Sequence, residues 1–239
     1  MSKFLPELVF IFLIAIYSIV ITKIIPKKLY SFSNLIIAFG AILYGVFFGT
    51  SLQQLGIGFN LILVNMLIGL ALSMPIIISI ILFSSYPTFS KHFSRQPNQN
   101  YNWHQFAYEL GFRIPFGTAL SEEVIFRSVL FAILLSNHSV ILAIIFDSII
   151  FGLWHVFPTL HAVKDHESLN NKLKNKHQRN MLAVFVSIIT TSILGVGLAL
   201  LTLKTKSFIS AWVLHSAING SAVFGGYFTI WRTRRQAKV

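Results

Sequence analysis

Apolar runs of about 20 residues recur along most of the chain, and this feature constrains the fold more than any other. A helix needs about 20 apolar residues to cross roughly 30 Å of hydrocarbon, and only helices and closed barrels satisfy their backbone hydrogen bonds inside a bilayer. The composition agrees, since 55% of the 239 residues are hydrophobic and 11% are charged. The alternating segments typical of a transmembrane barrel do not occur in the sequence. The sequence therefore predicts an all-α, polytopic transmembrane helical bundle.

Seven spans are predicted, and they form a single transmembrane domain over residues 1–239. A short amphipathic helix over 101–113 is expected to lie along the interface and to end near Pro115. The helices within 1–86 provide a membrane setting, whereas the segment from about 101 to 231 carries the polar motifs. The predicted spans are about 5–25, 33–53, 59–86, 112–136, 138–158, 181–203 and 207–231.

Basic residues are distributed unevenly between the two faces that seven crossings create. The N-terminal tail and the loops after spans two, four and six hold only Lys3, Lys204 and Lys206. By the positive-inside rule, the N-terminus is predicted outside and the C-terminus in the cytoplasm of a multi-pass plasma-membrane protein. The net charge of +12 then reflects topology and contact with anionic lipid, and not nucleic-acid binding. The opposite face holds Lys23, Lys27, Lys28, Lys91, Arg95, Lys164, Lys172, Lys174, Lys176, Arg179, Arg232, Arg234, Arg235 and Lys238.

Polar residues interrupt three of the predicted spans at matching depth, in the cytoplasmic half. An ionised carboxylate in a membrane helix costs about 2.5–3.5 kcal/mol on insertion scales, so such groups mark wet sites, ion pairs or chemistry. Three helices that place polar side chains in one layer predict a catalytic or binding centre. The residues are Glu122, Glu123 and Arg127 in the fourth span, Phe151 and His155 in the fifth, and His215 and Asn219 in the seventh.

Spacing along the fourth span gives its two glutamates different surroundings. Glu123 and Arg127 are i and i+4 on one helix face, which suits an internal ion pair. Glu122 is rotated by about 100° from Glu123, so it is free to point into a cavity as a candidate general base. On the seventh span, His215 and Asn219 share a face, and both can donate hydrogen bonds to one developing oxyanion.

The order of these motifs resembles the CAAX-protease and bacteriocin-processing family, also called the Abi family. Three motifs carry the resemblance: Glu-Glu-x-x-x-Arg at 122–127, Phe-x-x-x-His at 151–155 and His-x-x-x-Asn at 215–219. Members of that family are intramembrane endopeptidases. The resemblance therefore implies hydrolysis of a peptide bond in a lipidated tail, a bacteriocin leader or another peptide or membrane protein.

The resemblance also implies a role for each motif residue. A water molecule is held and activated on one side of the site, and a tetrahedral oxyanion is stabilised on the other. The remaining residues support the geometry, and one of them lies close enough to assist directly. The implied assignments are Glu122 and His155 for the water, His215 and Asn219 for the oxyanion, Arg127 and Phe151 for support, and Glu123 for support with direct assistance.

Two chemistries remain open for the activation of water. Glu122, His155 and His215 are chemically sufficient to hold zinc with an open position. The zinc motif His-Glu-x-x-His does not occur, and the sequence favours a water activated without an obligatory metal. A cysteine nucleophile is excluded because the chain contains no cysteine. An aspartyl mechanism needs two carboxylates, and Asp147 is the only aspartate within a span, where it is expected to be buried facing Arg127 or a hydroxyl.

Two non-protease functions compete with this prediction. The same fold can serve as a non-catalytic membrane scaffold or bacteriocin-immunity factor that binds a partner. Glu122 and Glu123 could also act as the relay of a proton-coupled transporter. The pairing of a candidate base with a candidate oxyanion site favours the protease, and the lack of an inverted repeat disfavours the transporter. The sequence indicates neither the substrate nor the oligomeric state.

Overall fold

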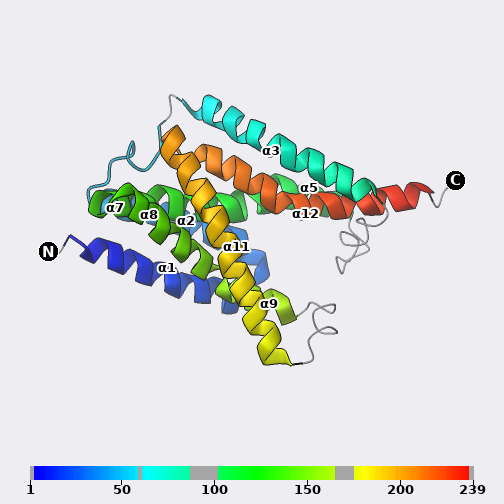
Figure 1. Cartoon of the computed structure of the whole chain (residues 1–239), viewed down its shortest axis with the longest axis horizontal. Coiled ribbons are helices and arrows are strands. Elements are labelled where there is room, and N and C mark those ends of the chain that lie inside the picture. Colours follow the sequence, from blue (N-terminus) through cyan, green and yellow to red (C-terminus); the bar gives the residue numbers. More distant parts are fainter. Residues whose placement is uncertain (1–2, 59–60, 87–101, 165–174, 237–239) are drawn as a thin grey trace.

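The computed structural model describes residues 3–58, 61–86, 102–164 and 175–236 of the chain. Within these ranges the backbone forms helices joined by short turns, and it contains no strand (Figure 1). The prediction of an all-α helical membrane bundle is confirmed for this part of the chain.

Five helices of the described segments are long and apolar enough to cross a membrane. Many of their large apolar side chains are exposed, as expected where the surrounding solvent is lipid. They correspond to five of the seven predicted spans. They are α1 (Leu5–Lys23), the 3-10 turn η1 (Lys27–Leu29) with α2 (Tyr30–Phe47), α3 (Ile62–Ser85), α8 (Val140–Trp154) with α9 (Val156–Lys164), and α11 (Lys176–Thr205).

The predicted spans 112–136 and 207–231 lie in two further helical stretches that carry polar site residues. One is α12 (Ile209–Gln236). The other runs without a break from Trp103 to Asn137 and alternates between α-helical and π-helical turns. Its parts are α5 (Trp103–Tyr108), the π segments η3 (Glu109–Arg113) and η4 (Pro115–Ala119), α6 (Leu120–Glu123), the π segment η5 (Val124–Leu130) and α7 (Phe131–Asn137).

The sequence predicted a separate amphipathic helix over 101–113, and the predicted C-terminal end of this helix is wrong. Proline has no backbone N–H and its ring crowds the preceding turn, so a helix end near Pro115 is the ordinary expectation. Here the chain changes to π-helical hydrogen bonds, from Ile114 N to Glu109 O at 2.9 Å and from Ala119 N to Ile114 O at 2.9 Å. The wider π turn accommodates the proline, and the helix continues into the fourth predicted span.

Two other boundaries also differ from the prediction. The second span was expected to reach residue 53, but α2 ends at Phe47, and Gly49 follows with a φ of 88°. Glycine adopts such a positive φ without steric cost, and this ends the helix. The fifth span was expected to continue to residue 158, but α8 ends at Trp154 and α9 begins at Val156. Pro158 cannot donate to the carbonyl four residues earlier, which favours this break.

The helix from Trp103 to Asn137 forms the centre of the bundle. Every residue from 121 to 134 is buried, and α2, α8 and α12 all pack against this helix. Around it, α3 lies along α12 and α11 lies along α8 (Figure 1). The second pair approaches closely at Gly152, where an added Cβ would lie 2.9 Å from the Ile188 carbonyl oxygen. This close packing brings α8, α11 and α12 around the polar residues of α6.

Contacts at the ends of the helices join segments that are distant in the sequence. Glu7, near the start of α1, accepts hydrogen bonds from Asn137 at 3.0 Å and lies 2.9 Å from His138 Nε2. Ser207, just before α12, donates to the Gly56 carbonyl oxygen at 3.0 Å. The N-terminal end thus contacts the turn after α7, and the turn before α12 contacts the segment after α2.

Candidate active site

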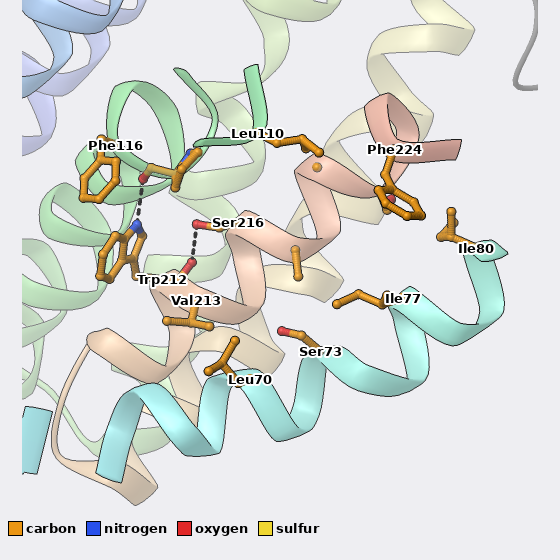
Figure 2. Close-up of a pocket in the computed structure, with 14 residues that line it drawn as sticks. Leu70, Ser73, Ile77, Ile80, Leu110, Phe116, Trp212, Val213, Ser216 and Phe224 are labelled. Atoms are coloured by element: carbon orange, nitrogen blue, oxygen red, sulfur yellow. Dashed lines mark hydrogen bonds between the residues drawn. The ribbon is translucent and has the colours of Figure 1, made fainter. Parts of the chain in front are cut away.

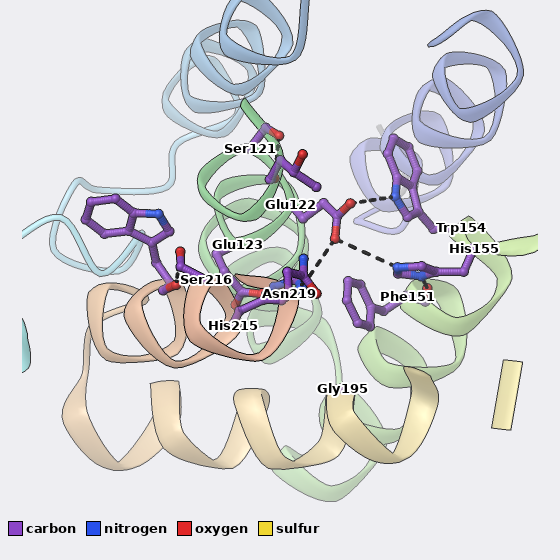
Figure 3. Close-up of polar contacts among 12 residues, drawn as sticks. Ser121, Glu122, Glu123, Phe151, Trp154, His155, Gly195, His215, Ser216 and Asn219 are labelled. Atoms are coloured by element: carbon purple, nitrogen blue, oxygen red, sulfur yellow. Dashed lines mark hydrogen bonds and ion pairs between the residues drawn. The ribbon is translucent and has the colours of Figure 1, made fainter. Parts of the chain in front are cut away.

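The carboxylate of Glu122 lies where α6, α8 and α12 meet (Figure 3). Its Oε1 accepts a hydrogen bond from Trp154 Nε1 at 3.3 Å. Its Oε2 lies 3.9 Å from His155 Nε2 and 3.7 Å from His215 Nε2, and makes no hydrogen bond. One oxygen is therefore fixed by the indole, and the other faces both imidazoles at distances too long for direct hydrogen bonds.

His155 presents one particular nitrogen to this carboxylate. Its Nδ1 lies 2.8 Å from the carbonyl oxygen of Phe151, and a carbonyl only accepts, so Nδ1 carries the proton. In the neutral ring, Nε2 is then the unprotonated nitrogen on the Glu122 side. The Phe151 ring meets the imidazole in a T-shaped contact at 4.7 Å between centroids. The carbonyl and the ring of Phe151 together set the tautomer and orientation of His155.

His215 is held between a carboxylate and an amide. Its Nδ1 lies 2.7 Å from Glu123 Oε1, and its Nε2 lies 3.1 Å from Asn219 Nδ2. The side chain of Glu123 is fully buried and that of His215 is 2% exposed. The ionised Glu123 carboxylate accepts from Nδ1–H, so Nε2 faces Asn219 and the Glu122 side of the site. Sequence spacing predicted the proximity of His215 and Asn219 but gave no indication of the contact with Glu123.

Arg127 lies behind this group in a second, fully buried cluster. Its Nε is 3.6 Å from Glu123 Oε2, as the i, i+4 spacing predicts, and also 3.6 Å from Asp147 Oδ2. Its Nη2 donates to the Gly195 carbonyl oxygen at 3.3 Å, and its guanidinium lies 4.0 Å from the centroid of the Phe151 ring. One cation is thus shared by two buried carboxylates, and Glu123 joins this cluster to His215.

The residues named from the sequence for a zinc site are close to one another but form no metal-holding group. Across the described ranges, no set of three or more His, Cys, Asp or Glu side chains comes together so that it could hold a metal ion. The Nε2 atoms of His155 and His215 both face a single oxygen, Glu122 Oε2, and His215 Nε2 also contacts Asn219 Nδ2.

An apolar groove runs along another face of α12, between α3 and the Leu110–Phe116 stretch (Figure 2). Its volume is about 410 Å³. The serine hydroxyls in its wall already donate to carbonyls of their own helices, for example Ser216 to Trp212 at 2.7 Å. The Trp212 indole donates to the Pro115 carbonyl oxygen at 2.6 Å. With its polar groups satisfied in this way, the groove is suited to a hydrocarbon chain.

The part of the chain that carries the site residues also matches a known protein family. Residues 102–221 match the family described as Type II CAAX prenyl endopeptidase Rce1-like. The chain belongs to this family. The match includes every motif residue from Glu122 to Asn219, so it confirms the resemblance to CAAX proteases and places the chain among hydrolases that act as proteases. No curated protein and no solved structure matches the chain.

Proposed function

We propose that the chain is an intramembrane endopeptidase that hydrolyses a peptide bond in a lipidated or otherwise membrane-associated substrate. The observation that carries the proposal is the gap between Glu122 Oε2 and the two histidines, at 3.9 Å and 3.7 Å. A water molecule that donates one hydrogen to Glu122 Oε2 and one to His155 Nε2 satisfies both acceptors. Such a water is held with its lone pairs free to attack a carbonyl carbon.

The reaction then follows from the positions of these groups. Glu122 removes a proton as the water oxygen bonds to the scissile carbonyl carbon, and the carbonyl oxygen becomes an oxyanion. Asn219 Nδ2 carries two N–H groups: one donates to His215 Nε2 at 3.1 Å, and the other is a donor to the oxyanion. Glu123, 2.7 Å from His215 Nδ1, keeps the proton on that nitrogen, so Nε2 stays an acceptor that holds Asn219 in place. The proton on Glu122 passes to the leaving amine as the carbon–nitrogen bond breaks.

The substrate class rests on the family description and on the apolar groove. A prenyl endopeptidase acts on a substrate that carries a hydrocarbon chain, and the groove along α12 offers an apolar surface without free polar groups. The side of cleavage follows from the distribution of charge. The fourteen basic residues of the predicted cytoplasmic face favour cleavage from the cytoplasmic side of the plasma membrane, with the N-terminus outside. Neither catalytic step requires a resident metal.

The test compares the purified wild-type chain with Glu122→Gln on a prenylated CAAX-type peptide in lipid vesicles. The amide keeps the shape of the carboxylate and removes the base, so cleavage should fall by about 10²–10⁴-fold. Glu7→Gln is the matched control, because Glu7 is also a buried membrane glutamate but contacts Asn137 and His138 at the end of the bundle. Wild-type cleavage by Glu122→Gln would refute the proposal.

A further inference from the structure

The N-terminal helix α1, which lies outside the family match, contacts the residue that fixes Glu122. That residue is Trp154, the last residue of α8 and the neighbour of His155. Its Nε1–H donates to Glu122 Oε1 at 3.3 Å, which leaves Oε2 directed at the histidines (Figure 3). The indole is 7% exposed and touches no other catalytic group through a hydrogen bond described in the structure. Its position therefore decides which carboxylate oxygen faces the reacting water.

The backbone of Trp154 is held by a hydroxyl from α1. An α-helical carbonyl normally accepts from the N–H four residues later, which here is Pro158, and proline has no N–H. Ser18 Oγ donates to the Trp154 carbonyl oxygen instead, at 3.0 Å, and Ser18 is 3% exposed. Because an unsatisfied buried carbonyl is costly, this contact fixes the end of α8 where Trp154 and His155 lie.

The indole ring is held by aromatic contacts on two sides. Tyr17, also on α1, stacks against it with centroids 6.0 Å apart and an interplanar angle of 28°. Phe126 of η5 meets it in a T-shaped contact at 5.8 Å. The Tyr17 hydroxyl donates to Asn34 Oδ1 at 2.8 Å, and Asn34 Nδ2 donates to the Gly117 carbonyl oxygen at 2.6 Å. This chain of contacts returns to the helix that carries Glu122.

We infer that Trp154 is a positioning residue for the general base, and that α1 sets the position of its indole through Ser18 and Tyr17. The inference rests on the proposed function, since it assigns Glu122 the role of base. It adds that Tyr17 and Ser18 of α1, which the family match at 102–221 does not include, help to position a catalytic group. Tyr17 and Ser18 act only through Trp154 and do not touch the substrate.

The first test is the kinetics of Trp154→Phe on the prenylated peptide. Phenylalanine keeps an aromatic ring and removes Nε1–H. A hydrogen bond to a charged group corresponds to a rate effect of about 10- to 100-fold, so kcat should fall by about this factor with little change in KM. A purely structural role for the indole would not lower kcat while leaving KM unchanged.

The contribution of α1 is tested by Ser18→Ala against Thr22→Val. Thr22 is one turn further along α1, and its hydroxyl bonds only to the Ser18 carbonyl oxygen of its own helix, at 2.8 Å. Ser18→Ala should reduce kcat by about two- to tenfold, whereas Thr22→Val should leave it unchanged. If Ser18→Ala or Trp154→Phe had the same kcat as the wild type, the inference would be overturned. Cleavage of the peptide by these proteins would still support the proposed function.

A readout without catalysis separates the two proposals. Thermal unfolding is measured for Trp154→Phe, Glu122→Leu and the double variant. Leucine has no acceptor for the indole N–H, so either single change removes the bond between Trp154 and Glu122, and the double variant should unfold at a temperature above that expected from adding the two shifts. Additive shifts would contradict the inference about Trp154, and this result does not depend on whether the preparation cleaves the peptide. Non-additive shifts in a protein without cleavage activity would contradict the proposed function alone.

Discussion

Replacement of Arg127 by methionine should destabilise the bundle more than any other single change at the site. Methionine is long and unbranched, so it fills much of the same space without the charge. The guanidinium is fully buried, 3.6 Å from both Glu123 and Asp147, and no other arginine or lysine is paired with these carboxylates in the described segments. Arg127→Met therefore leaves two buried carboxylates without their cation.

The magnitude follows from the number of charges left uncompensated. Removing one partner of a buried ion pair costs about 3–5 kcal/mol, and here one deletion affects two pairs. The Gly195 carbonyl oxygen also loses the donor at 3.3 Å. For a chain of this length, about 1 kcal/mol corresponds to a shift of roughly 2–4 °C in Tm, so the loss of one pair alone lowers Tm by about 6–20 °C, and Arg127→Met should lower it by at least this much.

A second substitution separates charge from packing. Asp147→Asn in the Arg127→Met background removes one of the two unpaired charges, so it should restore part of the lost stability. The same substitution in the wild-type background leaves Arg127 paired with Glu123 and should give no such gain. A rescue found only in the double variant would attribute the loss to buried charge.

Intrinsic tryptophan fluorescence during heating in detergent micelles is a suitable assay. The chain has four tryptophans and no cysteine, so thiol-reactive dyes give no signal. The variants are compared at one pH and one detergent concentration. A Tm for Arg127→Met within about 2 °C of wild type would refute the reasoning, because it would mean that the two carboxylates do not depend on this cation.

Four further outcomes are expected. Asn219→Ala should lower kcat for the prenylated peptide by about 10²–10³-fold, the usual loss for one oxyanion donor, with KM less affected. Glu123→Gln should reduce both kcat and Tm, because it weakens the contacts with His215 and Arg127 at once. Gly152→Ala should lower Tm in the same fluorescence assay, since the new Cβ would lie 2.9 Å from a backbone oxygen of α11, whereas Gly197→Ala, with no atom within 4 Å, should not. Dialysis against a strong chelator should leave the cleavage rate unchanged; a loss of activity that added zinc restores would contradict the metal-independent proposal.

The broad outline of the fold could be predicted because the bilayer allows few solutions. Apolar runs of sufficient length must be helices, and this placed the ends of α1, α3 and α11 to within about five residues. Boundaries failed where local backbone chemistry decides them. A π-helical turn at Pro115 and a break before Pro158 depend on which carbonyls find donors, and hydropathy carries no such information.

The sequence predicted which side chains lie together on one helix, but it did not predict the contacts between side chains of different helices. Spacing of three and four residues identifies side chains on one helix face, so the Glu123–Arg127 pair and the His215–Asn219 pair followed from sequence. Contacts between helices depend on how each helix is rotated against its neighbours. The bond from Glu123 to His215 and the bond from Trp154 to Glu122 are of this kind. The only sequence signal for Trp154 was its place beside His155.

The buried ring of Phe151 lies between the guanidinium of Arg127 and the imidazole of His155. This ring is completely buried, with Arg127 4.0 Å over its face, His155 at 4.7 Å and His215 at 5.9 Å between centroids. In the proposed mechanism, the charge on the substrate side changes with each proton transfer. An aromatic ring cannot carry a proton, so Phe151 separates Arg127 from His155, whereas Glu123 links the Arg127 cluster to His215.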